Sequence, residues 1–320
     1  MNSFPATGAA LALGAVLAPA FSWACACGCD VFDVGTATML ASQPGGVIFL
    51  EDDYQNQDQN WVGSHAAPAS ANSDKEIATH FGGVGFDYQF NGAWGMTVKA
   101  PYWKRLFRTD TGSAGAPDIM DFRHSGLGDV RISGRYTGFS PDLTTGITVG
   151  LKLATGDWTY PNFDRDTSIG TGTTDLLLGG YHLGVLSERG HLNWFAEVLY
   201  DRAFNTRDGY RPGNETVVAA GIVRSGLQLG QRGSLATLLQ VIGSNRLHDS
   251  GVNSDSINSG YKRVLLSPGV EAGIGHWKYY ADVEFRVYHY ANAAPSLATE
   301  GTQGQLVAPV LLKVMVSYHW

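Results

Sequence analysis

Residues 278–290 of the chain read KYYADVEFRVYHY, and their side chains alternate in polarity with a period of two. One face carries the less polar residues, namely Tyr279, Ala281, Val283, Phe285 and Val287. The other face carries Lys278, Tyr280, Asp282, Glu284, Arg286 and Tyr288. Successive side chains of a β-strand point to opposite faces, so this stretch predicts a strand with one apolar and one charged face.

The same pattern recurs elsewhere in the chain. In residues 145–154, Ile147, Val149 and Leu151 share a face, while Thr148 and Lys152 lie opposite. The last ten residues alternate as well, through Val310, Leu312, Val314, Val316, Tyr318 and Trp320. A final strand that ends in an aromatic residue resembles the terminal signal that the barrel assembly machinery reads in outer-membrane barrels.

Twelve such segments follow one another without a change of pattern. We place them at about 45–57, 77–90, 93–107, 127–139, 143–156, 174–187, 191–204, 215–229, 233–247, 261–274, 276–291 and 305–320. Five links are short and rich in turn-forming residues. They lie at Asn91-Gly92, Ser140-Pro141-Asp142, Glu188-Arg189-Gly190, Gly230-Gln231-Arg232 and near Gly275. The alternate links are long and polar, at 58–76, 108–126, 157–173, 205–214, 248–260 and 292–304.

Outer-membrane barrels have an even number of strands, short periplasmic turns and long external loops. The short and long links therefore predict an all-β fold, a transmembrane antiparallel β-barrel of about twelve strands over residues 45–320. A charge that faces lipid at mid-membrane costs a few kcal/mol, so the charged faces must point inward. We expect outer-membrane lipid and the barrel assembly machinery as partners, and both ends of the barrel on the periplasmic side.

The composition agrees with this class. Charged residues make up 16% of the chain and aromatic residues 11%, and there are 41 glycines. The net charge of −7 argues against a nucleic-acid partner, which requires a basic surface. No internal stretch has the roughly 18–20 continuous apolar residues that a spanning helix needs.

The N-terminal part differs from the rest. An apolar run from about Ala9 to Phe21 precedes Ser22 and Ala24, which predicts a signal peptide over residues 1–24. Residues 25–44 have no strand alternation. We expect them to form a short periplasmic segment or a plug at the periplasmic mouth.

The fourth segment opens with Ser125-Gly126-Leu127-Gly128-Asp129-Val130-Arg131-Ile132. This resembles the G-L-G-D-V signature of an outer-membrane family named for the meta-pathway of phenol degradation, whose members are described as transporters. The resemblance implies a channel for small molecules, including hydrophobic or aromatic ones. Independently of it, Gly126 and Gly128 permit a kink or a close strand approach, and Asp129 shares a face with Arg131.

The inward faces predict a lumen with charges of both signs. The lumen and constriction candidates are Asp129, Arg131, Arg135, Lys152, Glu197, Arg224, Glu271, Asp282, Glu284, Arg286 and Lys313. Two interpretations stay open for them. They form ion pairs that serve the scaffold, because unpaired buried charges are costly, or they form a constriction that selects solutes.

All three cysteines lie together in Cys25-Ala-Cys27-Gly-Cys29. Clustered thiolates suit a soft metal ion such as Cu(I) or Zn(II), so Cys25, Cys27 and Cys29 are candidate ligands. A disulfide in the oxidising periplasm, lipidation of Cys25 and the absence of any specific chemistry are the alternatives.

Two further sequence patterns were compared with known functional motifs, and neither supports catalysis or calcium binding. The H-x-S-N-G pattern of the twelve-stranded outer-membrane phospholipase is absent, so we do not expect an enzyme. Residues 164–170 superficially resemble a calcium loop, but Ile169 occupies the position that requires Gly, and we expect an ordinary external loop.

The function predicted is passive or weakly selective passage of small solutes through the outer membrane, with no cofactor. The alternative is a barrel that anchors a metal-handling or interaction segment through its cysteines.

Overall fold

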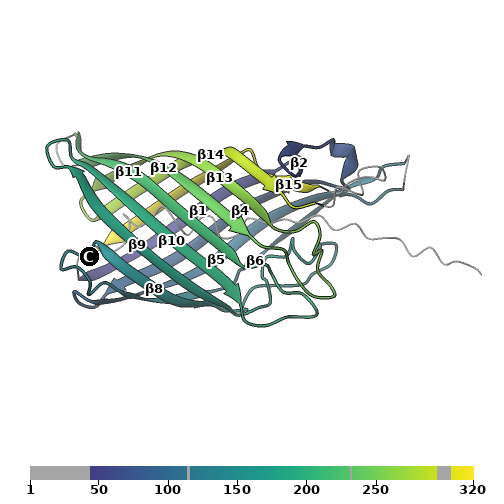
Figure 1. Cartoon of the computed structure of the whole chain (residues 1–320), viewed down its shortest axis with the longest axis horizontal. Helices are drawn as coiled ribbons and strands as arrows, with labels where there is room; N and C mark the ends of the chain where they lie inside the picture. Colours follow the sequence, from purple (N-terminus) through teal and green to yellow (C-terminus); the bar gives the residue numbers. More distant parts are fainter. Residues whose placement is uncertain (1–43, 114–115, 231–232, 294–303) are drawn as a thin grey trace, which may run out of the picture.

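The computed structural model describes residues 44–113, 116–230, 233–293 and 304–320, and within them the chain forms one closed antiparallel β-barrel of twelve strands (Figure 1). The predicted fold class and strand number are thus confirmed. The predicted signal peptide and the cysteine segment fall within residues 1–43 and lie outside the described residues.

Each wall strand pairs with its neighbours in the chain, and pairing of β1 with β16 closes the ring. The wall consists of β1 (Gly45–Gln57), β4 (Asp74–Gln89), β5 (Trp94–Asp110), β7 (Arg131–Tyr136), β8 (Thr145–Lys152), β9 (Asp175–Ser187), β10 (Leu192–Ala203), β11 (Glu215–Leu229), β12 (Gly233–Arg246), β13 (Tyr261–Ile274), β14 (Trp277–Ala291) and β16 (Val310–His319). The closing register runs from Val47 opposite His319 to Gln55 opposite Leu311.

The links are sorted by length onto the two ends of the barrel, as the sequence predicts (Figure 1). The short turns lie at the end that holds Gly46 and Trp320, whose backbones exchange two hydrogen bonds of 3.2 and 3.1 Å. In outer-membrane barrels this is the periplasmic end. The long links lie at the other, external end.

Three wall strands differ clearly from the predicted segments, and one of them, β8, ends at Lys152 instead of near residue 156. The fourth strand is longer than predicted, because β6 (Ile119–Leu127) pairs with the outer half of β5 and continues into β7 after an interruption at residues 128–130. Much of the predicted loop 108–126 is therefore a strand hairpin. The last segment is divided into β15 (Gln305–Val307) and β16, because Pro309 separates them and lacks the N–H that a ladder needs.

Further short elements extend the external end. β2 (Gln59–Val62) pairs with β15 and with β3 (His65–Ala66), and the 3-10 turn η3 (Ala69–Ala71) follows. Among the described residues, no helix is long and apolar enough to cross a membrane.

The outer face of the wall is apolar where the alternation predicts it. Ile147, Val149 and Leu151 on β8 are all more than 40% exposed, as are Phe285 and Val287 on β14. In a membrane these side chains face lipid. Tyr288, predicted inward, lies on this outer face, because a β-bulge opposite Val264 and Leu265 shifts the alternation by one residue and turns His289 inward instead.

An aromatic belt marks the periplasmic end. Phe90, Trp94, Phe139, Trp277 and Trp320 are all about half exposed there. Aromatic side chains favour the membrane–water interface, and girdles of them flank the apolar band of outer-membrane barrels. Within this belt, the ring of the C-terminal Trp320 contacts that of Phe86, with 6.1 Å between the ring centroids.

The inner face is mixed rather than uniformly polar. Besides charged residues, it buries two apolar clusters within the lumen. One contains Phe81, Trp103, Ile169, Phe195, Val217, Ala219, Ile242, Leu265, Ala308 and Leu311, and the other contains Val47, Phe49, Leu238, Tyr280 and Met315. The clusters show that the lumen is partly filled by side chains.

Candidate functional site

The interruption of the fourth strand positions the candidate site. At residues 128–130 the wall loses part of its ladder, and Thr155 replaces it: its hydroxyl accepts from the Val130 amide at 2.9 Å and donates to the Gly128 carbonyl at 3.0 Å. β8 ends early, at Lys152. The chain then turns away from the wall. Residues 153–174, which we name the inner loop, connect β8 to β9 across the inside of the barrel.

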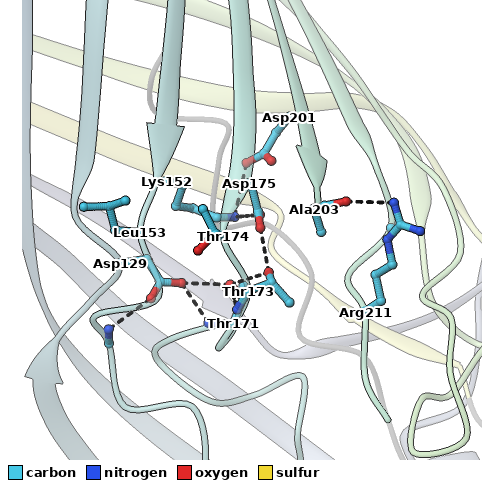
Figure 2. A network of polar contacts seen from close by, with 12 residues as sticks. Asp129, Lys152, Leu153, Thr171, Thr173, Thr174, Asp175, Asp201, Ala203 and Arg211 are labelled. Atoms are coloured by element: carbon cyan, nitrogen blue, oxygen red, sulfur yellow. Dashed lines mark hydrogen bonds and ion pairs between the residues drawn. The ribbon is translucent and has the colours of Figure 1, made fainter. Parts of the chain in front are cut away.

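Asp129 holds both ends of the inner loop (Figure 2). Its carboxylate accepts hydrogen bonds from the amide of Gly156 at 3.0 Å, from the amide of Thr171 at 2.8 Å and from the Thr171 hydroxyl at 2.9 Å. Asp129 is 5% exposed. The aspartate of the G-L-G-D-V motif thus fastens the inner loop to the wall.

The glycines of this region allow backbones to touch. A Cβ on Gly156 would lie 2.9 Å from the carbonyl carbon of Gly128 and 3.0 Å from Cα of Gly170. A Cβ on Gly170 would lie 2.5 Å from the carbonyl oxygen of Gly156. Three backbones therefore meet in van der Waals contact at a point that no larger residue fits. Gly128 serves the close approach that the sequence predicts.

The tip of the inner loop lies inside the barrel, so the prediction of an ordinary external loop over residues 164–170 is wrong. Ile169 is 2% exposed and belongs to the larger apolar cluster, with Phe81 and Trp103. Arg105 of β5 donates to the carbonyl oxygens of Thr167 and Ser168 at 2.5 and 3.3 Å. Burial of Ile169 and satisfaction of two backbone carbonyls favour the inserted position.

Lys152 forms an ion-pair network at the base of the inner loop (Figure 2). Its Nζ lies 2.6 Å from Asp175 and 3.1 Å from Asp201, on the two next strands. The Thr173 hydroxyl donates to Asp175 at 2.6 Å. This network ties the returning end of the inner loop to three wall strands.

The rest of the inner loop carries aromatic and charged groups of its own. The guanidinium of Arg165 lies 5.2 Å from the ring centre of Trp158 and 4.4 Å from that of Tyr210. Burial raises the pKa of Asp164 to about 6. Burial, followed by the charges of Asp164 and Asp249, raises the pKa of Asp166 well above its ordinary value. The inserted loop thus favours protonated aspartates.

Two cavities show what the inner loop does to the lumen. A narrow cavity of about 60 Å³ lies between the inner loop and the wall, lined among others by Asp53, Lys99, Trp103, Arg131 and Ile169. A wide cavity of about 420 Å³ lies nearer the periplasmic end, lined among others by Leu183, Val185, Phe195, Val223 and Glu271. The free volume beside the inner loop is therefore smaller than that nearer the periplasmic end.

The other predicted lumen residues lie at separate places on the inner wall, most of them with contacts of their own. Arg135 is 1% exposed and donates to Asp87 at 2.8 and 3.0 Å, which is a buried scaffold contact. Glu271 pairs with Lys278 at 3.4 Å. Arg286 donates to Gln59 at 2.7 Å and lies 4.2 Å from the ring centre of Trp61. Glu197 lies on the inner face of β10.

Asp282, Glu284 and Lys313 lie together on the inner wall with Asp53 of β1, a residue that the sequence did not single out as a lumen candidate. Lys313 stands opposite Asp53 on one side and opposite Asp282 on the other. Its Nζ is 3.9 Å from Asp53. All four side chains are less than 5% exposed.

The inward prediction for Arg224 is wrong. It lies on the outer face of β11 with Val218 and Ile222, near the periplasmic end of the strand. Close to the interface the cost of a lipid-facing charge falls to about 0–1 kcal/mol, and a long side chain reaches the head groups. The charge of Arg224 therefore does not by itself determine whether the side chain lies on the inner or the outer face of the barrel.

One Ser–His pair lies on β16 near the periplasmic end. Ser317 Oγ and His319 Nε2 are 3.0 Å apart, and Ser317 is 0% exposed. Asp87 stands two strands away in the same row, but its carboxylate is bound by Arg135. The pair is not directed at lipid.

Cys25, Cys27 and Cys29 lie outside the described residues, so the soft-metal site stays a prediction. Within residues 44–113, 116–230, 233–293 and 304–320, no group of three or more His, Cys, Asp or Glu residues has the geometry to hold a metal ion.

Comparison with known proteins identifies the fold. No family model and no curated protein matches the sequence. An outer-membrane channel from Pseudomonas putida F1 has a similar structure, with 12% identity, a TM-score of 0.60 and coverage of 88% of this chain and 97% of that one. The β domain of the Bordetella autotransporter BrkA has 14% identity and a TM-score of 0.49, covering 87% and 100%.

At such identity the similarity shows the fold. A closed twelve-stranded barrel with an apolar outer band and an aromatic belt is that of a bacterial outer-membrane protein, and the protein is located in that membrane. The resemblance to the phenol-degradation family stays a prediction.

Proposed function

We propose that the protein is an outer-membrane channel for small solutes, in which the inner loop sets the width of the pore. The observation that carries this proposal is the pair of cavities within a closed barrel, a narrow one lined by Ile169 of the inner loop and a wide one lined by Phe195. The Pseudomonas putida protein of similar fold is an outer-membrane channel, which supports the same role here.

The side chains that line the lumen support a particular class of solutes, namely small molecules with both an apolar and a polar part. Charged side chains are present, but Phe81, Trp103 and Phe195 are all buried in the lumen and belong to one apolar cluster. A purely polar lumen would not require large aromatic rings there. The mixture suits small molecules that combine an aromatic or apolar part with a polar group, since sites for such molecules are largely apolar with a few polar groups.

Reconstitution of the mature protein into planar bilayers and liposomes tests the channel. Ion conductance and liposome swelling in arabinose are expected. The absence of both, with correctly folded protein, would refute the proposed function.

The solute class has its own test. Benzyl alcohol is expected to reduce the ion current in a concentration-dependent way, and Phe195→Ala, in the wall of the wide cavity, is expected to weaken this block. Phe139→Ala is the matched control, because Phe139 is 59% exposed on the periplasmic rim. Equal block in all three proteins would remove the argument for aromatic solutes while leaving the channel itself intact.

A further inference from the structure

Among the described residues, the outer face of strands β9 to β13 carries positive charges and no carboxylate. Its exposed charged side chains are Arg202 on β10, Arg224 on β11 and Lys262 on β13. The carboxylates of these strands alternate with the outward positions and point inward; they are Asp175, Glu197, Asp201, Glu215 and Glu271. On the other side of the barrel, Asp52 of β1 faces outward beside His80. Positive charge at a membrane surface favours anionic lipid head groups on that side of the barrel.

Arg202 and Lys262 lie at the external end of this face. Arg202 precedes Ala203, the last residue of β10, and Lys262 follows Tyr261, the first residue of β13. Neither side chain forms an ion pair with a described residue. Because no carboxylate of the described chain neutralises them, both are available to phosphate, which guanidinium and ammonium groups bind strongly.

A hollow lies in the outer face between these cations and the middle of the wall. It has a volume of about 590 Å³, and we name it the outer hollow. Apart from His182, its outward residues are apolar, and they include Gly180, Ala196, Ala220 and Gly243. Ala196 and Ala220 are paired across β10 and β11, so only methyl groups cover the sheet there. An acyl chain fits such a hollow, because an empty one would lose van der Waals contacts with its surroundings.

The outer hollow and the cations belong to successive rows of the same sheet. The row through the hollow runs from Gly180 across Val198, Val218 and Gly243 to Val264. The next outward row toward the external end consists of Tyr200, Thr216, Asn245 and Lys262. Arg202 is the next outward residue of β10 after Tyr200. Polar and basic groups therefore lie directly above apolar space, which matches the order of head group and acyl chain in a lipid.

The polar row between the two cations offers hydrogen bonds to a sugar head group. Asn214 donates to the Tyr200 hydroxyl at 3.1 Å, which leaves the phenolic hydrogen free to donate. Asn245 is exposed in the same row. Arg202 on β10 and Lys262 on β13 are three strand spacings apart, about 14 Å across the sheet. A head group with one phosphate reaches one of them, whereas a disaccharide with a phosphate at each end reaches both.

We propose that this face binds one molecule of lipid A, the phosphorylated disaccharide lipid of lipopolysaccharide, in the external leaflet. One acyl chain lies in the outer hollow, the sugars contact Tyr200 and Asn245, and the two phosphates bind Arg202 and Lys262. A phospholipid fits less well, because its single phosphate satisfies only one cation. The inference goes beyond the proposed channel function and is independent of it, since lipid binding requires no conductance.

Native mass spectrometry of the refolded barrel in detergent, titrated with bis-phosphoryl lipid A, measures this binding. The wild type is expected to bind one molecule. Arg202→Gln and Lys262→Gln are each expected to weaken binding about fivefold, and the double variant about 25-fold, the factors that basic residues contribute near an anionic lipid. Arg224→Gln is the matched control and should bind as the wild type does, because Arg224 is exposed on the same face at the periplasmic end.

The outer hollow has its own pair of variants. Ala220→Phe fills the hollow and is expected to weaken binding with both cations in place. Ala281→Phe places the same ring on the outer face of β14, outside the hollow, and is expected to leave binding unchanged. Both substitutions place an apolar ring against lipid, so the barrel is expected to fold in both cases.

A comparison on the wild type alone decides the matter even where a variant fails to fold. Binding of monophosphoryl lipid A and of phosphatidylethanolamine that is about fivefold weaker or more supports the proposal, and equal binding of all three lipids overturns it. Equal binding of bis-phosphoryl lipid A by the wild type, the double variant and Ala220→Phe also overturns it, and leaves only the lipid contact that any membrane barrel makes. None of these outcomes affects the channel, which conductance tests separately.

Discussion

Replacing Asp129 with Ala is expected to release the inner loop and widen the pore. Asp129 accepts three hydrogen bonds from the inner loop, two of them from Thr171 and one from Gly156. A hydrogen bond to a charged group contributes about 1.5–3 kcal/mol. Three independent bonds would contribute about 4.5–9 kcal/mol, but bonds to one carboxylate are not additive.

The net loss is also reduced because other contacts remain. Arg105 still binds the loop carbonyls, and Ile169 still packs in the apolar cluster. We therefore expect a loss of about 3 kcal/mol, which shifts the ratio of inserted to released loop by about 150-fold. Asp129→Asn keeps the side-chain size and part of the acceptor capacity, so its effect is expected to lie between those of the wild type and Asp129→Ala.

Single-channel recording in planar bilayers measures this shift. The wild type is expected to occupy mainly a low-conductance state, and Asp129→Ala a higher or frequently fluctuating one. Asp157→Asn is the control, because Asp157 belongs to the same inner loop but has a 62% exposed side chain that contacts His124. If Asp129→Ala folds and gives the same distribution of conductance as the wild type, the inner loop does not limit the pore and the reasoning fails.

Three further predictions concern the same barrel. Burial raises the pKa of Asp164 from 3.8 to about 6, so the stability of the inserted loop should be fully present below about pH 4 and decline as the pH rises through 6. Mean conductance should thus increase between pH 5 and pH 7.5, and Asp164→Asn should abolish that increase. Gly170→Ala should raise conductance as Asp129→Ala does, because its Cβ would overlap the backbone of the inner loop. Arg135→Leu leaves Asp87 buried and unpaired, and should lower the free energy of unfolding by about 3–5 kcal/mol in urea titrations, with a much smaller change for Arg108→Leu on the exposed external hairpin.

The wall was predictable because its determinants are local. The alternation in residues 278–290 and the short turns between strands specify which faces meet lipid, whatever the rest of the chain does. The predictions of inward and outward faces fail where strand alternation or the membrane penalty no longer determines the face of a residue. Tyr288 changes face at a bulge, and Arg224 lies where the membrane penalty is small.

The inner loop was not predictable in the same way. Its position depends on contacts between residues far apart in sequence, such as Asp129 with Thr171 and Arg105 with Thr167. The only local sign is composition: residues 167–174 read TSIGTGTT, with no charge and with Ile169 as their single large apolar residue. Such a segment can enter a lumen without burying charge. Asp53 was missed as a lumen candidate because it lies in an acidic run, Glu51-Asp52-Asp53, that suggests a solvated loop.

The break in the wall and the insertion of the inner loop are one structural event. β8 ends at Lys152, which pairs with Arg131, so the part of the fourth strand that precedes Arg131 has no ladder partner in β8. The amide of Val130 and the carbonyl of Gly128 are satisfied by Thr155, which belongs to the departing chain. Asp129 then binds the two ends of the same chain. Release of the inner loop therefore unpairs wall groups as well as loop groups. This coupling makes a partly open state costly and favours two discrete positions of the loop, which single-channel recordings would show as steps between levels rather than a continuous spread.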